Sequence, residues 1–189
     1  MVLVISKTPE DVERLLAPFD ENLEIEEVED AEYGNYWHNP KARWDYWRIG
    51  GRWRGELIAS DGLQPETSWD SPEERADGEV SQAQKKHVDF DAMGMRNLKR
   101  AEGFYDELAK SDPFNYLGGR TRDQYLRDAC RFTAFAVLTP DGEWHERGRM
   151  AWFGCVADER EATDWAEEFR RLTSAADPES WFTVVDVHI

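Results

Sequence analysis

The pattern of apolar and polar positions predicts strands near both ends of the chain. Residues 2–5 (Val-Leu-Val-Ile) form an unbroken apolar run, which is typical of a buried strand. Residues 181–189 (Trp-Phe-Thr-Val-Val-Asp-Val-His-Ile) are mostly apolar and predict a closing strand. A strand is also predicted at 132–138, followed by a Thr-Pro-Asp-Gly turn at 139–142 and a hairpin partner from Glu143 onward.

Other stretches repeat apolar residues at helical spacing. They predict helices that end near residue 16 and that span 88–110, 121–132 and 162–172. Thr121 is the predicted N-cap of the third helix, because its hydroxyl oxygen can accept a hydrogen bond from a backbone N–H of the first turn. Residues 23–28 (Leu-Glu-Ile-Glu-Glu-Val) partly alternate apolar with acidic side chains and favour a half-exposed strand.

These elements together predict an α+β fold, with an antiparallel or mixed sheet of hairpins packed by helices. A ferredoxin-like core is one arrangement that fits this succession. A chain of 189 residues is long enough for one domain with an ordinary core, so we predict a single domain over residues 1–189. Residues 60–80 are rich in Ser, Asp, Glu, Pro and Gly without an apolar period, and they predict a surface excursion.

The most unusual stretch is residues 44–53 (Trp-Asp-Tyr-Trp-Arg-Ile-Gly-Gly-Arg-Trp), which concentrates aromatic and cationic side chains. Its Gly50-Gly51 pair predicts a tight β-hairpin, because glycine readily adopts the positive φ that both turn residues need. Alternation along a strand predicts two sets of side chains on opposite faces, Trp44, Tyr46 and Arg48 on one and Asp45, Trp47 and Ile49 on the other.

Charge narrows the classes of function. The chain has 40 acidic and 23 basic residues and a formal net charge of −17, which repels nucleic-acid backbones and anionic membranes. Direct nucleic-acid binding and membrane association are therefore not expected. The acidic surface fits solubility, attraction to a basic partner protein, or imitation of a nucleic-acid backbone. The apolar run at 2–5 is too short for a signal peptide or a membrane span and favours a cytoplasmic location.

Aromatic rings and guanidinium groups in one segment predict a site for a small, nucleotide-like anion. A ring can stack on a base, and an arginine can pair with phosphate or carboxylate oxygens. The residues predicted to bind such a ligand are Trp44, Asp45, Trp47, Arg52, Trp53 and Trp152. A structural interpretation stays open for the same residues, in which the tryptophans pack across strands and an Arg–Asp pair holds the turn.

A second candidate set could carry acid/base chemistry. Asp186 and His188 lie two apart on the closing strand, so their side chains leave the same face. His145, on the predicted neighbouring hairpin, could join them. The alternative is that these are hydrogen-bonded side chains at strand ends. No HExxH or paired Cys/His spacing occurs, so no metal site is predicted, and the sequence identifies no cofactor.

Several of these residues belong to motifs that resemble an uncharacterised family of phage, prophage and actinobacterial proteins. The motifs are residues 39–47 (Asn-Pro-Lys-Ala-Arg-Trp-Asp-Tyr-Trp), 49–53 (Ile-Gly-Gly-Arg-Trp), 141–145 (Asp-Gly-Glu-Trp-His), 152–154 (Trp-Phe-Gly) and 186–189 (Asp-Val-His-Ile). The resemblance implies a common fold. It also implies one constellation of Trp44, Asp45, Arg52, Trp53, Trp152, Asp186 and His188.

Two functions are compatible with the sequence. The first is a phage-type accessory protein that sequesters or acts on a small anionic, nucleotide-like molecule, with Arg52 pairing with the anion. In it, Trp44 or Trp47 stacks on the ring, while Asp186 and His188 supply acid/base chemistry. The alternative is an interaction module that masks a basic host or defence protein. Its acidic face consists of Asp20, Glu21, Glu24, Glu26, Glu27, Glu29, Asp30 and Glu32.

Overall fold

The fold is described from a computed structural model of the chain. The structure describes residues 1–32, 34–63, 78–112, 115–150 and 156–188. Two predicted features lie outside these ranges: most of the surface excursion at 60–80, and Trp152.

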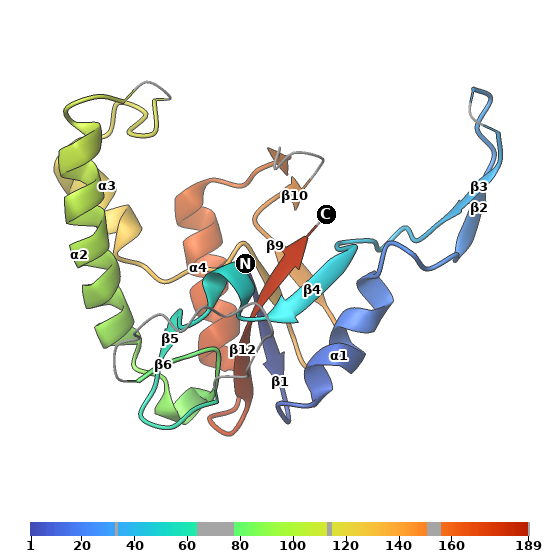
Figure 1. Ribbon diagram of the computed structural model, residues 1–189, viewed down its shortest axis with the longest axis horizontal. Coiled ribbons are helices and arrows are strands. Elements are labelled where there is room, and N and C mark those ends of the chain that lie inside the picture. The colour runs from blue at the N-terminus through green and yellow to red at the C-terminus, as the bar shows by residue number, and fades with distance from the viewer. Residues whose placement is uncertain (33, 64–77, 113–114, 151–155, 189) are drawn as a thin grey trace.

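A six-stranded mixed sheet forms the centre of the protein (Figure 1). Its order is β4-β12-β1-β8-β9, and β7 also pairs with β12. The strands are β1 (Val2–Ser6), β4 (Tyr46–Ile49), β7 (Gln82–Gln84), β8 (Ala136–Leu138), β9 (Trp144–Glu146) and β12 (Trp181–His188). β1 runs antiparallel to β12 and parallel to β8. The predicted α+β fold is confirmed, and the two predicted end strands, β1 and β12, are neighbours in the sheet.

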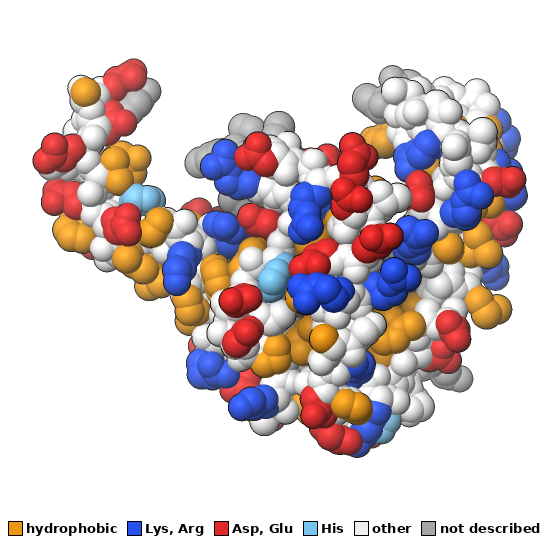
Figure 2. Space-filling view, turned by 180° about the vertical axis from the view of Figure 1, so that it is seen from behind, with side chains coloured by type: hydrophobic (Ala, Val, Ile, Leu, Met, Phe, Trp, Pro, Cys, Tyr) orange, Lys and Arg blue, Asp and Glu red, His pale blue; other side chains and the backbone are white. Residues whose placement is uncertain are grey.

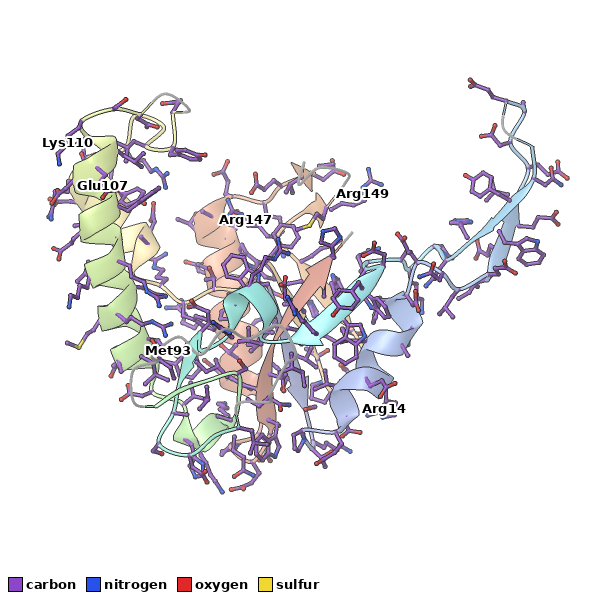
Figure 3. The ribbon with its side chains drawn as sticks, in the orientation of Figure 1. Arg14, Met93, Glu107, Lys110, Arg147 and Arg149 are labelled. Atoms are coloured by element: carbon purple, nitrogen blue, oxygen red, sulfur yellow. The ribbon has the colours of Figure 1, made fainter. Side chains whose placement is uncertain are left out.

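Helices cover both faces of the sheet, which explains why β1 is apolar without a break from Val2 to Ile5. Val2 and Val4 of β1 pack on the side of α1 (Asp11–Leu16), whereas Leu3 and Ile5 pack on the side of α4 (Ala162–Ala175). α2 (Phe90–Leu108) covers the same face as α4, and its Met93 is fully buried there (Figure 3). A strand buried on both faces does not alternate apolar with polar residues.

The succession β1-α1-β8-β9-α4-β12 has the strand–helix–strand–strand–helix–strand order of a ferredoxin-like core. However, α1 and α4 pack on opposite faces of the sheet. Residues between α1 and β8 also contribute β4 and β7 to it. The likeness to a ferredoxin-like core is therefore limited to the order of these elements along the chain.

Shorter elements complete the fold. β5 (Leu57–Ile58) pairs with β6 (Glu79–Val80), and β10 (Arg149–Met150) pairs with β11 (Val156–Ala157). The 3-10 helices are η1 (Ala17–Phe19), η2 (Gly51–Trp53) and η3 (Lys85–His87). α3 (Arg122–Ala129) packs on α2 and begins at the predicted cap. The Oγ1 of Thr121 accepts a hydrogen bond from the Gln124 backbone N–H at 3.3 Å, which completes a capping box.

A two-stranded ribbon stands away from the body of the protein (Figure 1). β2 (Glu26–Val28) pairs antiparallel with β3 (Tyr36–His38), and these two strands form a sheet of their own. We call residues 21–38 the acidic arm. An isolated two-stranded hairpin is only marginally stable in water, so the arm benefits from anchoring or from a covering partner.

The arm is anchored where it meets the body. The buried amide Nδ2 of Asn39 donates to the carbonyl oxygens of Pro18 and Asp20, at 2.9 and 2.8 Å. On the other side, the Glu21 backbone N–H donates to the carbonyl oxygen of Trp44 at 2.9 Å. The buried Asn39 side chain therefore joins the residue that follows the arm to the residues that precede it. These bonds fix the direction in which the arm leaves the body.

Candidate functional site

The predicted hairpin at Gly50-Gly51 is not formed. β4 pairs instead with the closing strand β12, with Ile49 opposite Val185 and Tyr46 opposite His188. Both glycines have the positive φ expected of a turn, but the chain enters η2 and then β5, which pairs with β6. The physical reason is burial: Leu57 of β5 packs fully into the core beneath α2 and α4, which draws the chain across the sheet face.

Trp44 and Trp47 belong to the core on the α1 side of the sheet. The indole Nε1 of buried Trp44 donates to the carbonyl oxygen of Leu16 at 3.1 Å. Its ring meets that of Trp47 edge-on, with centroids 6.5 Å apart. The predicted placement of these two rings on opposite faces is wrong. Trp44 precedes β4, and an isolated bridge to Asp20 holds it where strand alternation does not apply.

Arg52 and Asp186 form a bidentate ion pair that joins η2 to β12. The Asp186 side chain is 9% exposed, and the Arg52 side chain above it is 62% exposed. Nη2 of Arg52 donates to Oδ1 at 2.7 Å, Nε donates to Oδ2 at 3.0 Å, and the Arg52 backbone N–H also donates to Oδ2, at 2.9 Å. The partner of Arg52 thus lies 134 residues along the chain. Guanidinium and backbone together hold both carboxylate oxygens.

The close approach of η2 to Asp186 explains why residue 51 is a glycine. A Cβ at this position would lie 2.5 Å from the Cβ of Asp186 and 2.6 Å from its Oδ2, closer than real Cβ contacts. The φ of Gly51 is also positive, at +54°. A glycine is needed because the η2 backbone approaches the carboxylate closely enough to donate the Arg52 N–H.

The ion pair keeps Asp186 ionised. Burial by itself would raise the pKa of Asp186, but hydrogen bonds from the Arg52 side chain and backbone, with the charge of the guanidinium, outweigh burial and lower the pKa below 3.8. The same hydrogen bonds raise the pKa of Arg52. An ionised carboxylate with both oxygens occupied is poorly suited to transfer a proton near neutral pH. The geometry therefore favours a structural role for Asp186.

The side chains predicted for acid/base chemistry have separate partners. Nδ1 of His188 lies 3.6 Å from Oδ1 of Asp45, so the two form an ion pair when the imidazole is protonated. His145 lies on β9, and β1 and β8 separate β9 from β12. Three strand spacings amount to roughly 14 Å. His145 instead lies between Glu143 and Glu168, with N–O distances of 3.6 and 3.8 Å.

An exposed cationic and aromatic surface lies beside the ion pair. Tyr46 of β4 and Trp53 of η2 both present exposed rings. Arg48 lies opposite Asp186 in the β4–β12 register and makes no ion pair with any described residue. Of the residues predicted to bind a ligand, Trp53 and Arg52 reach this surface, Trp44 and Trp47 belong to the core, and Trp152 lies outside the described residues.

The acidic arm carries exposed apolar side chains that sequence analysis did not identify. Trp37 lies opposite Glu27 in the ribbon, and Ile25 directly precedes β2, where its backbone N–H donates to the carbonyl oxygen of His38 at 3.2 Å. Ile25 and Trp37 are 51% and 53% exposed. Figure 2 shows hydrophobic side chains among the acidic ones along the arm. The sequence pattern that could have revealed these side chains is the alternation at 23–28, because its apolar positions need a neighbouring surface to exclude water.

A groove of about 930 Å³ lies between α2, α4 and the chain that follows α3. We call it the α2–α4 groove. Met95, which is 73% exposed, and the less exposed Phe90 and Leu98 line it from α2. Phe132 and Phe169 line it from the other side, with ring centroids 5.8 Å apart. The groove was not predicted, because its walls come from segments that are distant in sequence.

Two arginines that line the groove have no acidic partner among the described residues. Most arginines of the described residues have acidic partners; Arg14, Arg147 and Arg149, which Figure 3 labels, pair with Asp11, Glu159 and Asp158. Arg131 and Arg170 line the groove and make no ion pair within the described ranges. Asp91 and Glu167 line it too, without pairing with either arginine. The groove thus offers an anion two available guanidinium groups.

None of the described helices combines the length and apolar character needed to cross a membrane. In the same part of the chain, no group of three or more His, Cys, Asp or Glu side chains is placed to hold a metal ion. No protein-family model matches the sequence, and no curated protein or solved structure is significantly similar to it.

We expect Asp186→Asn and Arg52→Ala each to lower the free energy of unfolding by about 2 kcal/mol at neutral pH, since hydrogen bonds to a charged acceptor contribute this much and exposure of Arg52 limits it. Because folding lowers the pKa of Asp186, its contribution is complete above the unfolded value near 3.8 and is lost as the pH falls through the folded value. Urea unfolding should therefore show the difference between wild type and Asp186→Asn shrinking as the pH falls below 3.8.

The matched control is Arg171→Ala. The Arg171 side chain is also 62% exposed, but it pairs with Glu168 one helical turn away, so its loss should matter much less. A pH-independent difference for Asp186→Asn, or equal effects of Arg52→Ala and Arg171→Ala, would contradict this account.

Gly51→Ala should destabilise the protein more than Gly118→Ala does. The two glycines have nearly equal φ, +54° and +55°, but a Cβ at Gly118 would meet nothing within 4 Å. Gly118→Ala should therefore cost about 1 kcal/mol for its backbone conformation, and Gly51→Ala about 1 to 3 kcal/mol more for the clash with Asp186. Urea unfolding measures the free energy of unfolding of both variants, and equal losses would contradict this explanation.

Proposed function

We propose that this protein is an interaction module, and that its acidic arm covers an apolar surface rimmed by cations on a partner protein. The observation that carries the proposal is the exposure of Ile25 and Trp37 on a ribbon that stands away from the body. Exposed apolar side chains gathered on a projecting element mark interaction sites. Tryptophan in particular is enriched among the residues that dominate binding energy.

The charges on the arm support a partner of this kind. Glu24, Glu26 and Glu27 form no ion pair with any described Lys or Arg. Acidic side chains around an apolar centre attract a cationic rim and accelerate encounter with it. The buried Asn39 amide at the root of the arm adds pre-organisation, since a fixed arm loses less conformational freedom on binding. In the phage-type family that the motifs resemble, such a partner would be a host or defence protein.

This proposal is preferred to acid/base catalysis because of the Asp186 contacts. Arg52 occupies the Asp186 carboxylate, and His188 and His145 have carboxylate neighbours of their own on different strands. By contrast, Ile25 and Trp37 of the arm are 51% and 53% exposed.

The double variant Ile25→Ser/Trp37→Ser should lose at least about tenfold in affinity for the partner, because it removes the apolar centre of the interface. Proteins retained from lysate by the immobilised wild type would be identified and purified, and their dissociation constants measured at low and high salt. Affinity should fall with salt, as expected for a charged rim.

The matched control is Phe104→Ser, which removes an exposed aromatic side chain of α2, at the opposite end of the protein from the arm (Figure 1), and should leave binding unchanged. Retention that is insensitive to salt, or that survives the arm variant, would count against the proposal.

A second candidate is binding of a nucleotide-like anion at the surface beside the ion pair. The specific observation in its favour is Arg48, which has no acidic partner among the described residues and lies near the exposed ring of Tyr46. A ring and a guanidinium group can bind the base and phosphate of such a ligand.

For this candidate, one or more nucleotides should raise the melting temperature of the wild type, and Arg48→Ala should abolish the increase. Arg127→Ala is the control, because Arg127 is an exposed arginine of α3 far along the chain from this surface. No stabilisation by any nucleotide, or equal stabilisation of Arg48→Ala, would exclude it.

A further inference from the structure

The strand β4 is an edge of the central sheet, and part of its backbone faces away from its neighbour. Among the described strands, β4 pairs only with β12. The ladder continues just past β4, where the Gly50 backbone N–H donates to the carbonyl oxygen of Val184 at 2.8 Å. Hydrogen-bonded and non-hydrogen-bonded pairs alternate along an antiparallel ladder. Arg48 is therefore bonded to β12, whereas the N–H and C=O groups of Trp47 and Ile49 point outward.

The protein pairs another of its own segments with the residues just before β4, but not with β4 itself. Asp20 and Trp44 form a parallel bridge, and the Glu21 backbone N–H donates to the carbonyl oxygen of Trp44 at 2.9 Å. From Glu21 onward the chain forms the acidic arm, so this pairing ends where β4 begins. The outward backbone groups of β4 have no backbone partner among the described residues. They form an open edge on which a further strand can continue the sheet.

The side chains of β4 determine what an added strand must carry. Arg48 makes no ion pair with any described residue. Trp47 packs against the core on the α1 side, and both Trp47 and Ile49 are only half-buried. In an added strand of either direction, the residue opposite Arg48 shares its face, and the two flanking residues share the face of Trp47 and Ile49. The sequence that fits this edge is therefore apolar–acidic–apolar.

The charges around Arg48 leave it available to such a strand. Asp186, opposite Arg48 in the ladder, is already held by Arg52, and Asp45 lies 3.6 Å from His188. A charged side chain on an edge strand discourages indiscriminate pairing. An acidic residue opposite Arg48 would form an ion pair, whereas a lysine or arginine there would be repelled. Arg48 therefore makes this edge selective.

We propose that the open edge of β4 binds an extended apolar–acidic–apolar segment of a partner protein, which adds a strand to the central sheet. In binding of this kind, backbone hydrogen bonds supply affinity and side-chain contacts supply specificity. Here the backbone bonds go to Trp47 and Ile49, and the ion pair goes to Arg48. The site is separate from the exposed side chains of the acidic arm, so the inference does not rest on the proposed function.

Capped peptides test the site. Each has the sequence acetyl-Ser-Thr-Φ-Glu-Φ-Thr-Ser-amide, where Φ is valine, isoleucine or phenylalanine. Hydrogen exchange of single amides would be followed by nuclear magnetic resonance. In the free protein, the Trp47 and Ile49 amides should exchange faster than the Arg48 amide, because only Arg48 is bonded to β12. At least one peptide should bind with a Kd below about 1 mM, so that about 2 mM peptide slows exchange at Trp47 and Ile49 at least about threefold.

Reversal of the charge at residue 48 tests the ion pair. Arg48→Glu should weaken binding of the best peptide about tenfold, and the same peptide with lysine in place of glutamate should bind Arg48→Glu better than it binds wild type. Arg127→Glu makes the same charge change at an exposed position on α3 and should bind like wild type. Circular dichroism of each variant would verify that the substitutions leave the fold intact.

Methylation of single peptide nitrogens tests strand pairing itself. Every second N–H of an added strand points toward β4. A methyl group at those nitrogens should therefore abolish binding, whereas a methyl group at the nitrogens between them should be tolerated. Which of the two sets is sensitive also gives the direction of the added strand.

The outcomes distinguish this inference from the proposed function. Unchanged exchange at Trp47 and Ile49 with every peptide overturns it. So does binding that Arg48→Glu leaves intact, or methylation that weakens binding equally at every position. The arm variant Ile25→Ser/Trp37→Ser should bind the peptides like wild type, and a loss there would contradict a separate site on β4. If no peptide binds but the wild type still retains a protein through Ile25 and Trp37, the interaction module stands and only the β4 site fails.

Discussion

A buried carboxylate places the main constraint on this fold. Asp186 lies on the central strand, where an unpaired charge would cost several kcal/mol, so its oxygens must be hydrogen-bonded. η2 provides these bonds through Arg52, and the close approach requires Gly51. The same contact holds β4 along the second half of β12, while β7 pairs with its first half. The aromatic and cationic segment is therefore, at its centre, a structural lock between distant parts of the chain.

Features set by local pattern could be predicted from the sequence, whereas features set by distant contacts could not. The apolar runs of β1 and β12, the helical spacing of α4 and the Thr121 cap were predicted correctly because neighbouring residues determine them. The Gly50-Gly51 turn was misassigned because positive φ fits several turns, and only burial of Leu57 selects the observed path. At the candidate site, an Arg–Asp lock was one of two interpretations, but its partner lay 134 residues away.

Charge is distributed unevenly between the body and the arm. On the body, several carboxylates are matched locally; Glu56, for example, accepts hydrogen bonds from both Arg96 and Arg100 of α2. On the arm, glutamates alternate with apolar residues that have no layer above them. Sequence periodicity can reveal that a strand has an apolar face but not that the face lacks a neighbour. The acidity of the chain is thus partly a local property of one projecting element.

The central position of β12 has a consequence for how the chain reaches this fold during synthesis. β1 is made first, but its antiparallel neighbour consists of residues 181–188, and β4 and β7 also pair with that strand. Until those residues leave the ribosome, three strands lack the edge they pair with, and Asp186 is not there to meet Arg52. Contacts of such long sequence separation slow folding and leave apolar edges exposed for longer. The pairing of β1, β4 and β7 with β12 therefore forms only after β12 has been made, so the middle of the sheet is completed late in synthesis.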